Sequence, residues 1–182
     1  MAQLLVVAIR LLVPLSILRW PLAGALASMA VDALDVVLVD AFARALGEPG
    51  EFGPIYAQLE KVLDTYYLTI ELYVAWRWRE QLLRRTAAVL YGWRLAGAIL
   101  FELTAFQPLL LVFPNLFENF FLYVLIMQKW ATRLVPRTIP QLLAVLFVLL
   151  VPKLAQEWLL HYEEAHPWQW LRDEILEPML GH

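Results

Sequence analysis

The chain has 182 residues, of which 62% are hydrophobic and 17% charged, and its mean hydropathy is +0.63. Soluble domains contain about 45 to 50% apolar and about 25% charged residues, so this chain has more apolar surface than a globule of its length can bury. The net charge of −3 argues against nucleic acid as a partner, and the absence of cysteine excludes disulfides and thiolate metal sites. The composition predicts an integral membrane protein whose main partner is the lipid bilayer.

Six apolar segments approach the length of about 20 residues that a helix needs to cross a bilayer. They cover residues 3–18, 21–39, 56–76, 86–104, 108–127 and 139–154. The segments are too long for barrel strands and do not alternate, so we expect an all-α bundle of six transmembrane helices within residues 1–160. The first segment is short and contains Arg10 and Pro14, which is also compatible with a tilted or re-entrant segment. No small-residue cleavage site follows it, so we interpret it as a retained helix and not a signal peptide.

The last segment, residues 161–182, is too charged for a seventh crossing. From Pro167 onward its apolar and charged residues fall on opposite sides of a short helix, which is typical of a helix lying in the lipid headgroup layer. The alternative is a solvated tail that packs on outer loops. The two sides are formed by Trp168, Leu171, Ile175 and Leu176, and by Arg172, Asp173, Glu174 and Glu177.

Loop charges predict the orientation, because Lys and Arg are enriched in cytoplasmic loops. The connections after the third and fifth segments are basic, whereas the connection after the second segment and the tail are mostly acidic. We therefore expect both termini outside, in a bacterial cytoplasmic membrane. Trp20, Trp76, Trp78, Trp93 and Trp130 lie mostly near segment ends, where we expect them to anchor at the interface. The basic residues of the connections after the third and fifth segments are Arg77, Arg79, Arg84, Arg85, Lys129, Arg133 and Arg137.

Eight charged residues fall inside the predicted spans, where each costs about 2.5 to 3.5 kcal/mol near the centre of a lone helix. Two are basic and six acidic, so even full pairing leaves a surplus of carboxylates. The surplus indicates protonated acids, bound cations or a wet cavity; the alternative is that Asp64 or Glu71 pairs with Arg10 or Arg94 to lock the bundle. The eight are Arg10, Asp32, Asp35, Asp64, Glu71, Arg94, Glu102 and Glu118.

Helical spacing suggests where the acids meet. Asp32 and Asp35 are three residues apart and share a face of the second segment, unless one of them caps a kink. A second stripe, Glu60, Asp64, Tyr67 and Glu71, follows the third segment. Asp32, Asp35, Glu60 and Asp64 can therefore form a carboxylate group suited to Mg²⁺, Mn²⁺ or Ca²⁺, which prefer oxygen ligands.

The fifth segment has a polar interruption in its middle. Pro114 is followed by Asn115, Glu118 and Asn119, three polar residues on one helical face. Proline-broken helices often form the binding sites of transporters, so these residues are further candidates for binding a cation or proton. The alternative is a kinked helix whose amides bond to neighbouring helices. In the fourth segment, small residues recur around Gly92 and predict a close approach of a neighbouring helix.

The acidic positions Asp32, Asp35, Glu60 and Asp64 resemble the motif of the CDP-alcohol phosphatidyltransferases. That family is built on six spans, and its four aspartates bind two divalent metals that carry a CDP-linked lipid. The first two positions and the last match the family, and Glu60 stands where an aspartate is expected. The family's glycine is Val36 here. The resemblance implies a metal-dependent phospholipid enzyme, which would require the orientation opposite to that given by the basic loops.

Three functions follow from these patterns. The first is a non-enzymatic membrane protein, as a homodimer or larger assembly, that binds or conducts a cation or proton through its intramembrane carboxylates. The second is the metal-dependent lipid enzyme that the resemblance implies. The third is a membrane scaffold or assembly protein in which acids and arginines only hold helices together. The substrate or ligand does not follow from the sequence.

Overall fold

The structure is a computed structural model that describes residues 1–182 except 48–53, 105, 107–108, 110–111 and 162–182; side chains are also not described at 36, 54–58, 60 and 156–161. The described residues form seven α-helices and two short 3-10 helices, without a strand. The all-α prediction is confirmed. The predicted interfacial helix of the tail lies outside the described residues.

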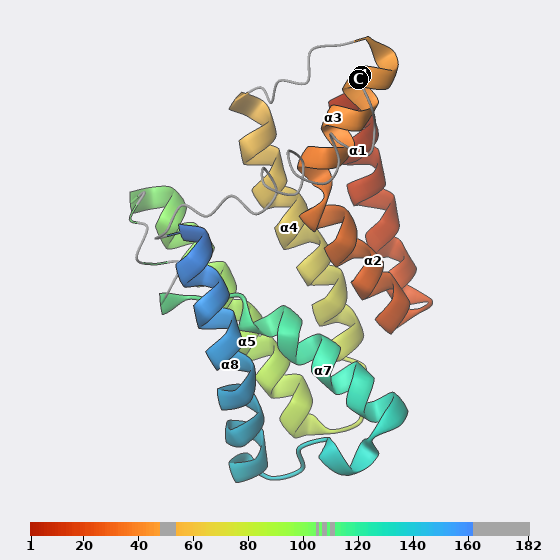
Figure 1. The fold of residues 1–182 in the computed structure, drawn as a ribbon. Coiled ribbons are helices and arrows are strands. Elements are labelled where there is room, and N and C mark those ends of the chain that lie inside the picture. The colour runs from red at the N-terminus through yellow and green to blue at the C-terminus, as the bar shows by residue number, and fades with distance from the viewer. Residues whose placement is uncertain (48–53, 105, 107–108, 110–111, 162–182) are drawn as a thin grey trace.

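The helices follow one another with short connections. Their bounds are α1 Ala2–Leu12, η1 Val13–Leu18, α2 Pro21–Ala33, α3 Asp35–Leu46, α4 Pro54–Ala75, α5 Gln81–Thr104, α7 Leu116–Trp130, η2 Thr132–Leu134 and α8 Ile139–His161. Figure 1 shows the chain running back and forth along the molecule: α1 runs down, α2 and α3 up, α4 down, α5 up, α7 down and α8 up. The α4–α5 and α7–α8 connections therefore lie at the same end.

The second predicted span is not one continuous helix. Helix α2 ends at Ala33, α3 begins at Asp35, and the chain bends by 68° between them. The linking residue Leu34 has φ −104° and ψ 7°, a conformation outside the α-helical region. Asp32 and Asp35 therefore flank a break in the helix, as in the kink alternative, and are not on one face of an uninterrupted span.

The fifth predicted span, residues 108–127, is not one continuous helix either. Helix α7 begins only at Leu116, and Asn115 stands before it in a non-helical conformation with φ −73° and ψ 70°. Pro114 explains the late start, because its ring disfavours helical conformation in the residue before it and it has no N–H to donate. Asn115 and Glu118 therefore lie at the start of a helix that follows the interruption at Pro114, and not inside one continuous helix.

Membrane-span criteria of length and hydropathy are met by fewer helices than the six predicted. Helix α5 meets them alone, and the bent pair α2 and α3 meets them if it is counted as one span. The segments Ala2–Leu18 and Ile139–Ala155 are apolar but shorter. Within the described residues, length and composition thus support one or two crossings.

The hydrophobic core surrounds α7. Phe117, Phe120 and Phe121 are fully buried, and Trp78 stacks on Phe121 with ring centroids 5.6 Å apart. The prediction that Trp78 anchors at an interface is therefore wrong, since its ring lies in the core; Trp20, Trp76 and Trp130 are exposed. Packing around α7 brings α2, α4, α5 and α8 together.

Two glycines allow close helix packing, but Gly92 is not one of them. A Cβ on Gly24 would lie 2.5 Å from the backbone nitrogen of Ile17, so α2 and η1 can approach only because Gly24 has no side chain. A Cβ on Gly97 would collide with Phe113. Gly92 is exposed, and no described atom lies within 4 Å of its Cβ position. The close approach predicted at Gly92 is thus not formed among the described residues.

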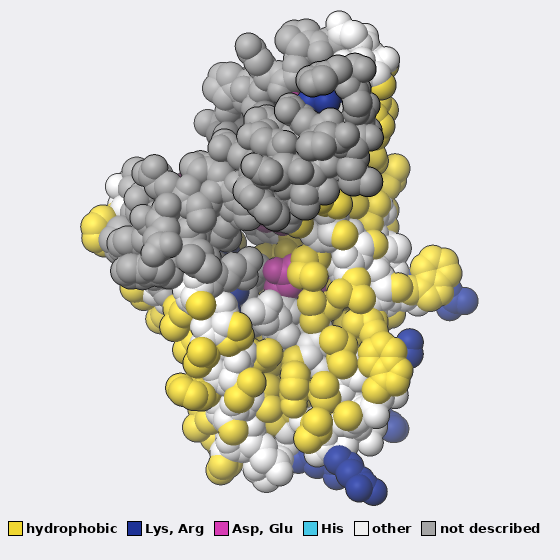
Figure 2. All heavy atoms as spheres, viewed as in Figure 1, with side chains coloured by type: hydrophobic (Ala, Val, Ile, Leu, Met, Phe, Trp, Pro, Cys, Tyr) yellow, Lys and Arg dark blue, Asp and Glu magenta, His cyan; other side chains and the backbone are white. Residues whose placement is uncertain are grey.

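The surface of the described part is unusually apolar. Large exposed hydrophobic side chains occur on α1, α4, α5 and α8, with Leu103, Val89, Phe147 and Val148 each at least two-thirds exposed. Figure 2 shows hydrophobic atoms over most of the described part of this face, Lys and Arg mainly at the lower end and along one edge, and acidic atoms in a central hollow. Exposed large apolar side chains thus occur on several helices of the described part.

Candidate functional site

Helix α4 arranges the ionisable side chains of the interior. Asp64, Tyr67 and Glu71 are three and four residues apart, so they share one helical face. Tyr67 is 5% exposed and Glu71 is fully buried, whereas the Asp64 side chain is 35% exposed. The predicted α4 stripe is therefore real from Asp64 onward, and it runs from a partly open region into the core.

The open end of this stripe is an ion-pair cluster around Arg10. The Arg10 Nη1 atom donates to Asp35 Oδ2 at 2.7 Å, and its Nη2 atom contacts both Asp32 Oδ1 and Asp64 Oδ1. The guanidinium group thus binds three carboxylates from α2, α3 and α4. The alternative in which Asp64 pairs with Arg10 is confirmed.

The position of Arg10 follows from the pattern of α1. Ala2, Val6 and Arg10 are four residues apart and are the three buried residues of this helix. Arg10 therefore lies on the inward face of α1, where only 3% of its side chain is exposed. An arginine in the apolar stripe of an amphipathic helix was the sequence signal for an interior ion pair.

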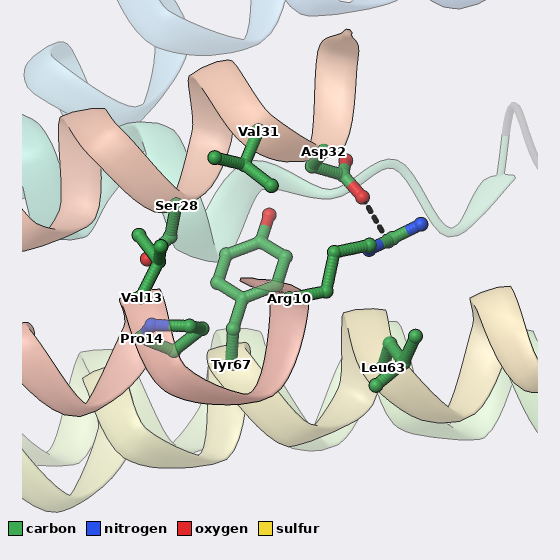
Figure 3. A pocket seen from close by; sticks show the side chains of 8 residues that line it. All are labelled: Arg10, Val13, Pro14, Ser28, Val31, Asp32, Leu63 and Tyr67. Carbon is green, nitrogen blue, oxygen red and sulfur yellow. Dashed lines mark hydrogen bonds and ion pairs between the residues drawn. The ribbon is translucent and has the colours of Figure 1, made fainter. Parts of the chain in front are cut away.

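A small pocket opens beside the cluster. It is lined by charged or hydroxyl-bearing side chains and by apolar ones, and it has room for about one water molecule. Figure 3 shows Arg10 reaching Asp32 from α1, while the Tyr67 ring stands between α4 and α2 with its hydroxyl directed toward Val31. The lining residues are Arg10, Val13, Pro14, Ser28, Val31, Asp32, Leu63 and Tyr67.

A second acidic group lies deeper, at the start of α7. Glu118 is 8% exposed and accepts two hydrogen bonds, from the Tyr67 hydroxyl at 2.7 Å and from Asn115 Nδ2 at 3.0 Å. The late start of α7 makes the second bond possible, because Asn115 precedes the helix and Glu118 lies in its first turn. Tyr67 thus belongs to both the pocket and the Glu118 group.

Glu71 is the least satisfied polar side chain of the described core. It is fully buried, and neither of its carboxylate oxygens has a hydrogen-bond partner among the described residues. It lies close enough to Glu118 for the two carboxyl groups to interact electrostatically. No described arginine pairs with Glu71. The predicted alternative, in which an arginine locks Glu71, is thus not observed among the described residues.

Basic groups approach Glu118 from two other helices without a hydrogen bond to it. Lys153 on α8 and Arg94 on α5 act on Glu118 electrostatically, as does Asp32 with the opposite sign. Arg94 is half-buried and donates to the carbonyl oxygen of Phe113 at 3.4 Å. The charges around Glu118 therefore come from three helices besides its own.

Three of the four carboxylates predicted to bind a metal ion contact an arginine. Asp32, Asp35 and Asp64 surround Arg10, and the Glu60 side chain lies outside the described residues. In the part of the chain that is described, no three His, Asp or Glu side chains are arranged to hold a metal ion. The assignment of Mg²⁺, Mn²⁺ or Ca²⁺ to these four residues stays a prediction.

The remaining candidates lie apart from these groups. Asn119 is half-buried on α7, beside Glu118 in sequence, and Glu102 is exposed on α5, where it pairs with Lys61 of α4. Tyr67 was part of the predicted stripe but not a predicted site residue. Its signal in the sequence was its position between Asp64 and Glu71.

Comparison with known proteins identifies no relative. No protein-family model matches the chain, and no curated protein and no solved structure is significantly similar to it. The similarity to CDP-alcohol phosphatidyltransferases therefore rests on the acidic positions alone.

Proposed function

We propose that the chain is a multi-pass membrane protein in which Glu71 and Glu118 take up a proton or a cation inside the helix bundle. The observation that carries the proposal is Glu71, a fully buried carboxyl group without a hydrogen-bond partner among the described residues.

Stability alone does not account for Glu71. A buried polar group without a partner costs about 1 to 3 kcal/mol, and more when charged. Leucine has a similar size and would avoid that cost. A second carboxyl group nearby, that of Glu118, increases the cost of any negative charge. A buried acid pair of this kind is neutralised when it binds a proton or a cation, which makes such binding the role the pair fits best.

The membrane setting is supported by the surface and by the order of the helices. Exposed apolar side chains cover α5 and α8, and helices run alternately in opposite directions (Figure 1). The basic α4–α5 and α7–α8 connections share one end, as the orientation by loop charge requires. Exposed Trp76 and Trp130 adjoin these two connections, where indole rings favour the membrane interface. These features support six passes, with α2 and α3 forming one broken pass.

The proposal can be tested in phospholipid vesicles containing the purified full chain. Proton entry is followed with an internal pH-sensitive dye, and Na⁺ or K⁺ entry with ion-sensitive dyes, under an imposed membrane potential. We expect flux through the native chain and at least a tenfold loss in Glu71→Gln and Glu118→Gln. Glu80→Gln, which changes an exposed glutamate in the α4–α5 connection, is the matched control and should keep native flux. Flux of no ion, or equal flux in all four proteins, would contradict the proposal.

A second candidate function, a scaffold, is favoured by the Arg10 cluster. One arginine holds α1, α2, α3 and α4 together, which an assembly protein could use without binding any ligand. In that case Glu71→Gln and Glu118→Gln would leave every transport measurement unchanged. Exchanging charges, with Arg10→Asp combined with Asp35→Arg, should then restore folding that Arg10→Asp alone destroys.

A further inference from the structure

We infer that the ion is a proton and that it reaches Glu118 from the Arg10 pocket through the hydroxyl of Tyr67. This inference rests on the proposed function and adds to it the identity of the ion and one connecting residue.

The surroundings of Glu118 fit a proton better than a metal cation. One of its oxygens accepts the Tyr67 hydroxyl and the other accepts the Asn115 amide, so both face hydrogen-bond donors. A Na⁺ or divalent ion would need several oxygen ligands directed at one point, and no such set of three acidic or His side chains occurs among the described residues. A proton needs only one acceptor oxygen and a neighbouring donor.

Tyr67 connects the two acidic regions. It lines the pocket together with Arg10 and Asp32 (Figure 3). The same side chain donates to Glu118 at 2.7 Å. The Asp32 and Asp64 side chains are about one-third exposed, whereas Glu118 is buried. A proton entering at the pocket therefore meets Tyr67 before it meets Glu118.

The proton transfer is a single relay step in which protons and charge balance. A hydronium ion formed by one water molecule in the pocket gives a proton to the Tyr67 hydroxyl oxygen. The original hydroxyl proton moves to Glu118 Oε1. The products are water, an unchanged phenol and a neutral Glu118 carboxyl group.

The charges facing Glu118 agree with a relay that has to return to its starting state. Asp32 acts on Glu118 with a negative charge, whereas Lys153 and Arg94 act on it with positive charges. Charges of both signs thus act on Glu118 from α2, α5 and α8. Neither form is locked by a direct ion pair with a described residue, which leaves the carboxyl group able to accept and release a proton.

The decisive variant is Tyr67→Phe, with Tyr66→Phe as its matched control. Both changes remove one phenol hydroxyl that donates one hydrogen bond, because Tyr66 donates to the carbonyl oxygen of Leu11 at 3.1 Å. Only the first breaks the link to Glu118. In vesicles of phosphatidylcholine and phosphatidylglycerol, we expect Tyr67→Phe to lower proton flux at least tenfold and Tyr66→Phe to keep it within twofold of native. Circular dichroism and gel filtration check that both variants are folded.

The outcomes separate this inference from the proposed function. Loss of proton flux in Glu71→Gln and Tyr67→Phe, but not in Tyr66→Phe, supports both. If Glu71→Gln abolishes flux and Tyr67→Phe does not, the relay is overturned and the proposed function stands. Flux of Na⁺ or K⁺ without protons overturns the identity of the ion. If Tyr67→Phe fails to fold, proton flux through the native chain in D₂O decides: a rate equal to that in H₂O overturns the relay, and a clearly slower rate supports it.

Discussion

The Arg10 cluster and the Glu71–Glu118 pair are both acidic groups inside the same bundle, but they differ in how their charges are met. Three carboxylates share the guanidinium group of Arg10, and the cluster is partly open to its surroundings. Glu71 has no hydrogen-bond partner among the described residues and is fully closed off. The first region therefore holds helices together, whereas the second keeps an unfavourable buried carboxyl group that stability does not explain.

Arg10→Ala should produce the largest effect on folding. Removing one partner of a buried ion pair costs about 3 to 5 kcal/mol, and we expect the lower end because Asp32 and Asp64 can be partly hydrated. Arg19→Ala, at an exposed arginine beyond η1, should change stability by less than about 0.5 kcal/mol. Unfolding in detergent micelles with increasing denaturant, followed by tryptophan fluorescence, measures both. Equal stability of the two variants would show that the cluster does not hold the helices.

Replacing each buried glutamate by leucine tests how Glu71 and Glu118 differ in their effect on stability. Glu118→Leu leaves the Tyr67 hydroxyl and the Asn115 amide without their acceptor, and we expect a loss of about 2 kcal/mol. Glu71→Leu removes two unsatisfied oxygens and should stabilise the chain by about 1 to 2 kcal/mol while abolishing flux. The same unfolding measurement applies. A strongly destabilised Glu71→Leu would mean that Glu71 has a structural partner.

Gly24→Ala tests how closely α2 must approach η1 beside the pocket. Its new Cβ would meet backbone atoms of Ser16 and Ile17, which cannot rotate away, so we expect a loss of about 1 to 2 kcal/mol. Gly92→Ala, where no described atom is near, should be neutral or stabilise α5 by up to about 1 kcal/mol. Thermal unfolding of the two variants side by side gives the difference. Equal melting temperatures would contradict the close packing at Gly24.

The helices were largely predictable because their apolar segments are long and separated by Pro, Gly or charge. The position of the break in the second span was not predictable, although a kink capped by Asp32 or Asp35 was one alternative. The break depends on tertiary contacts, because Arg10 binds carboxylates on both sides of Leu34. Pro114 did indicate the interruption before α7, although the predicted span of residues 108–127 placed this proline inside one helix. Spacing correctly aligned Asp64, Tyr67 and Glu71.

The candidate site was predictable as a set of charges but not as two groups. The sequence predicted a metal cluster of Asp32, Asp35, Glu60 and Asp64, with arginine pairing as the alternative for Asp64 alone among them. Only the fold brings Arg10 between Asp32, Asp35 and Asp64. The link from Tyr67 to Glu118 joins residues 51 positions apart. Periodicity on one helix carries no information about such a contact, because it depends on how α4 and α7 pack.

The Arg10 cluster also has a consequence for the order in which the chain is made. Arg10 leaves the ribosome 22 residues before Asp32, 25 before Asp35 and 54 before Asp64. Until those residues have been synthesised, the three carboxylates that bind Arg10 in the folded chain are missing. We therefore expect the first helix to take its final place only when the fourth has been synthesised, so that nascent chains ending before Asp64 leave α1 accessible to proteases.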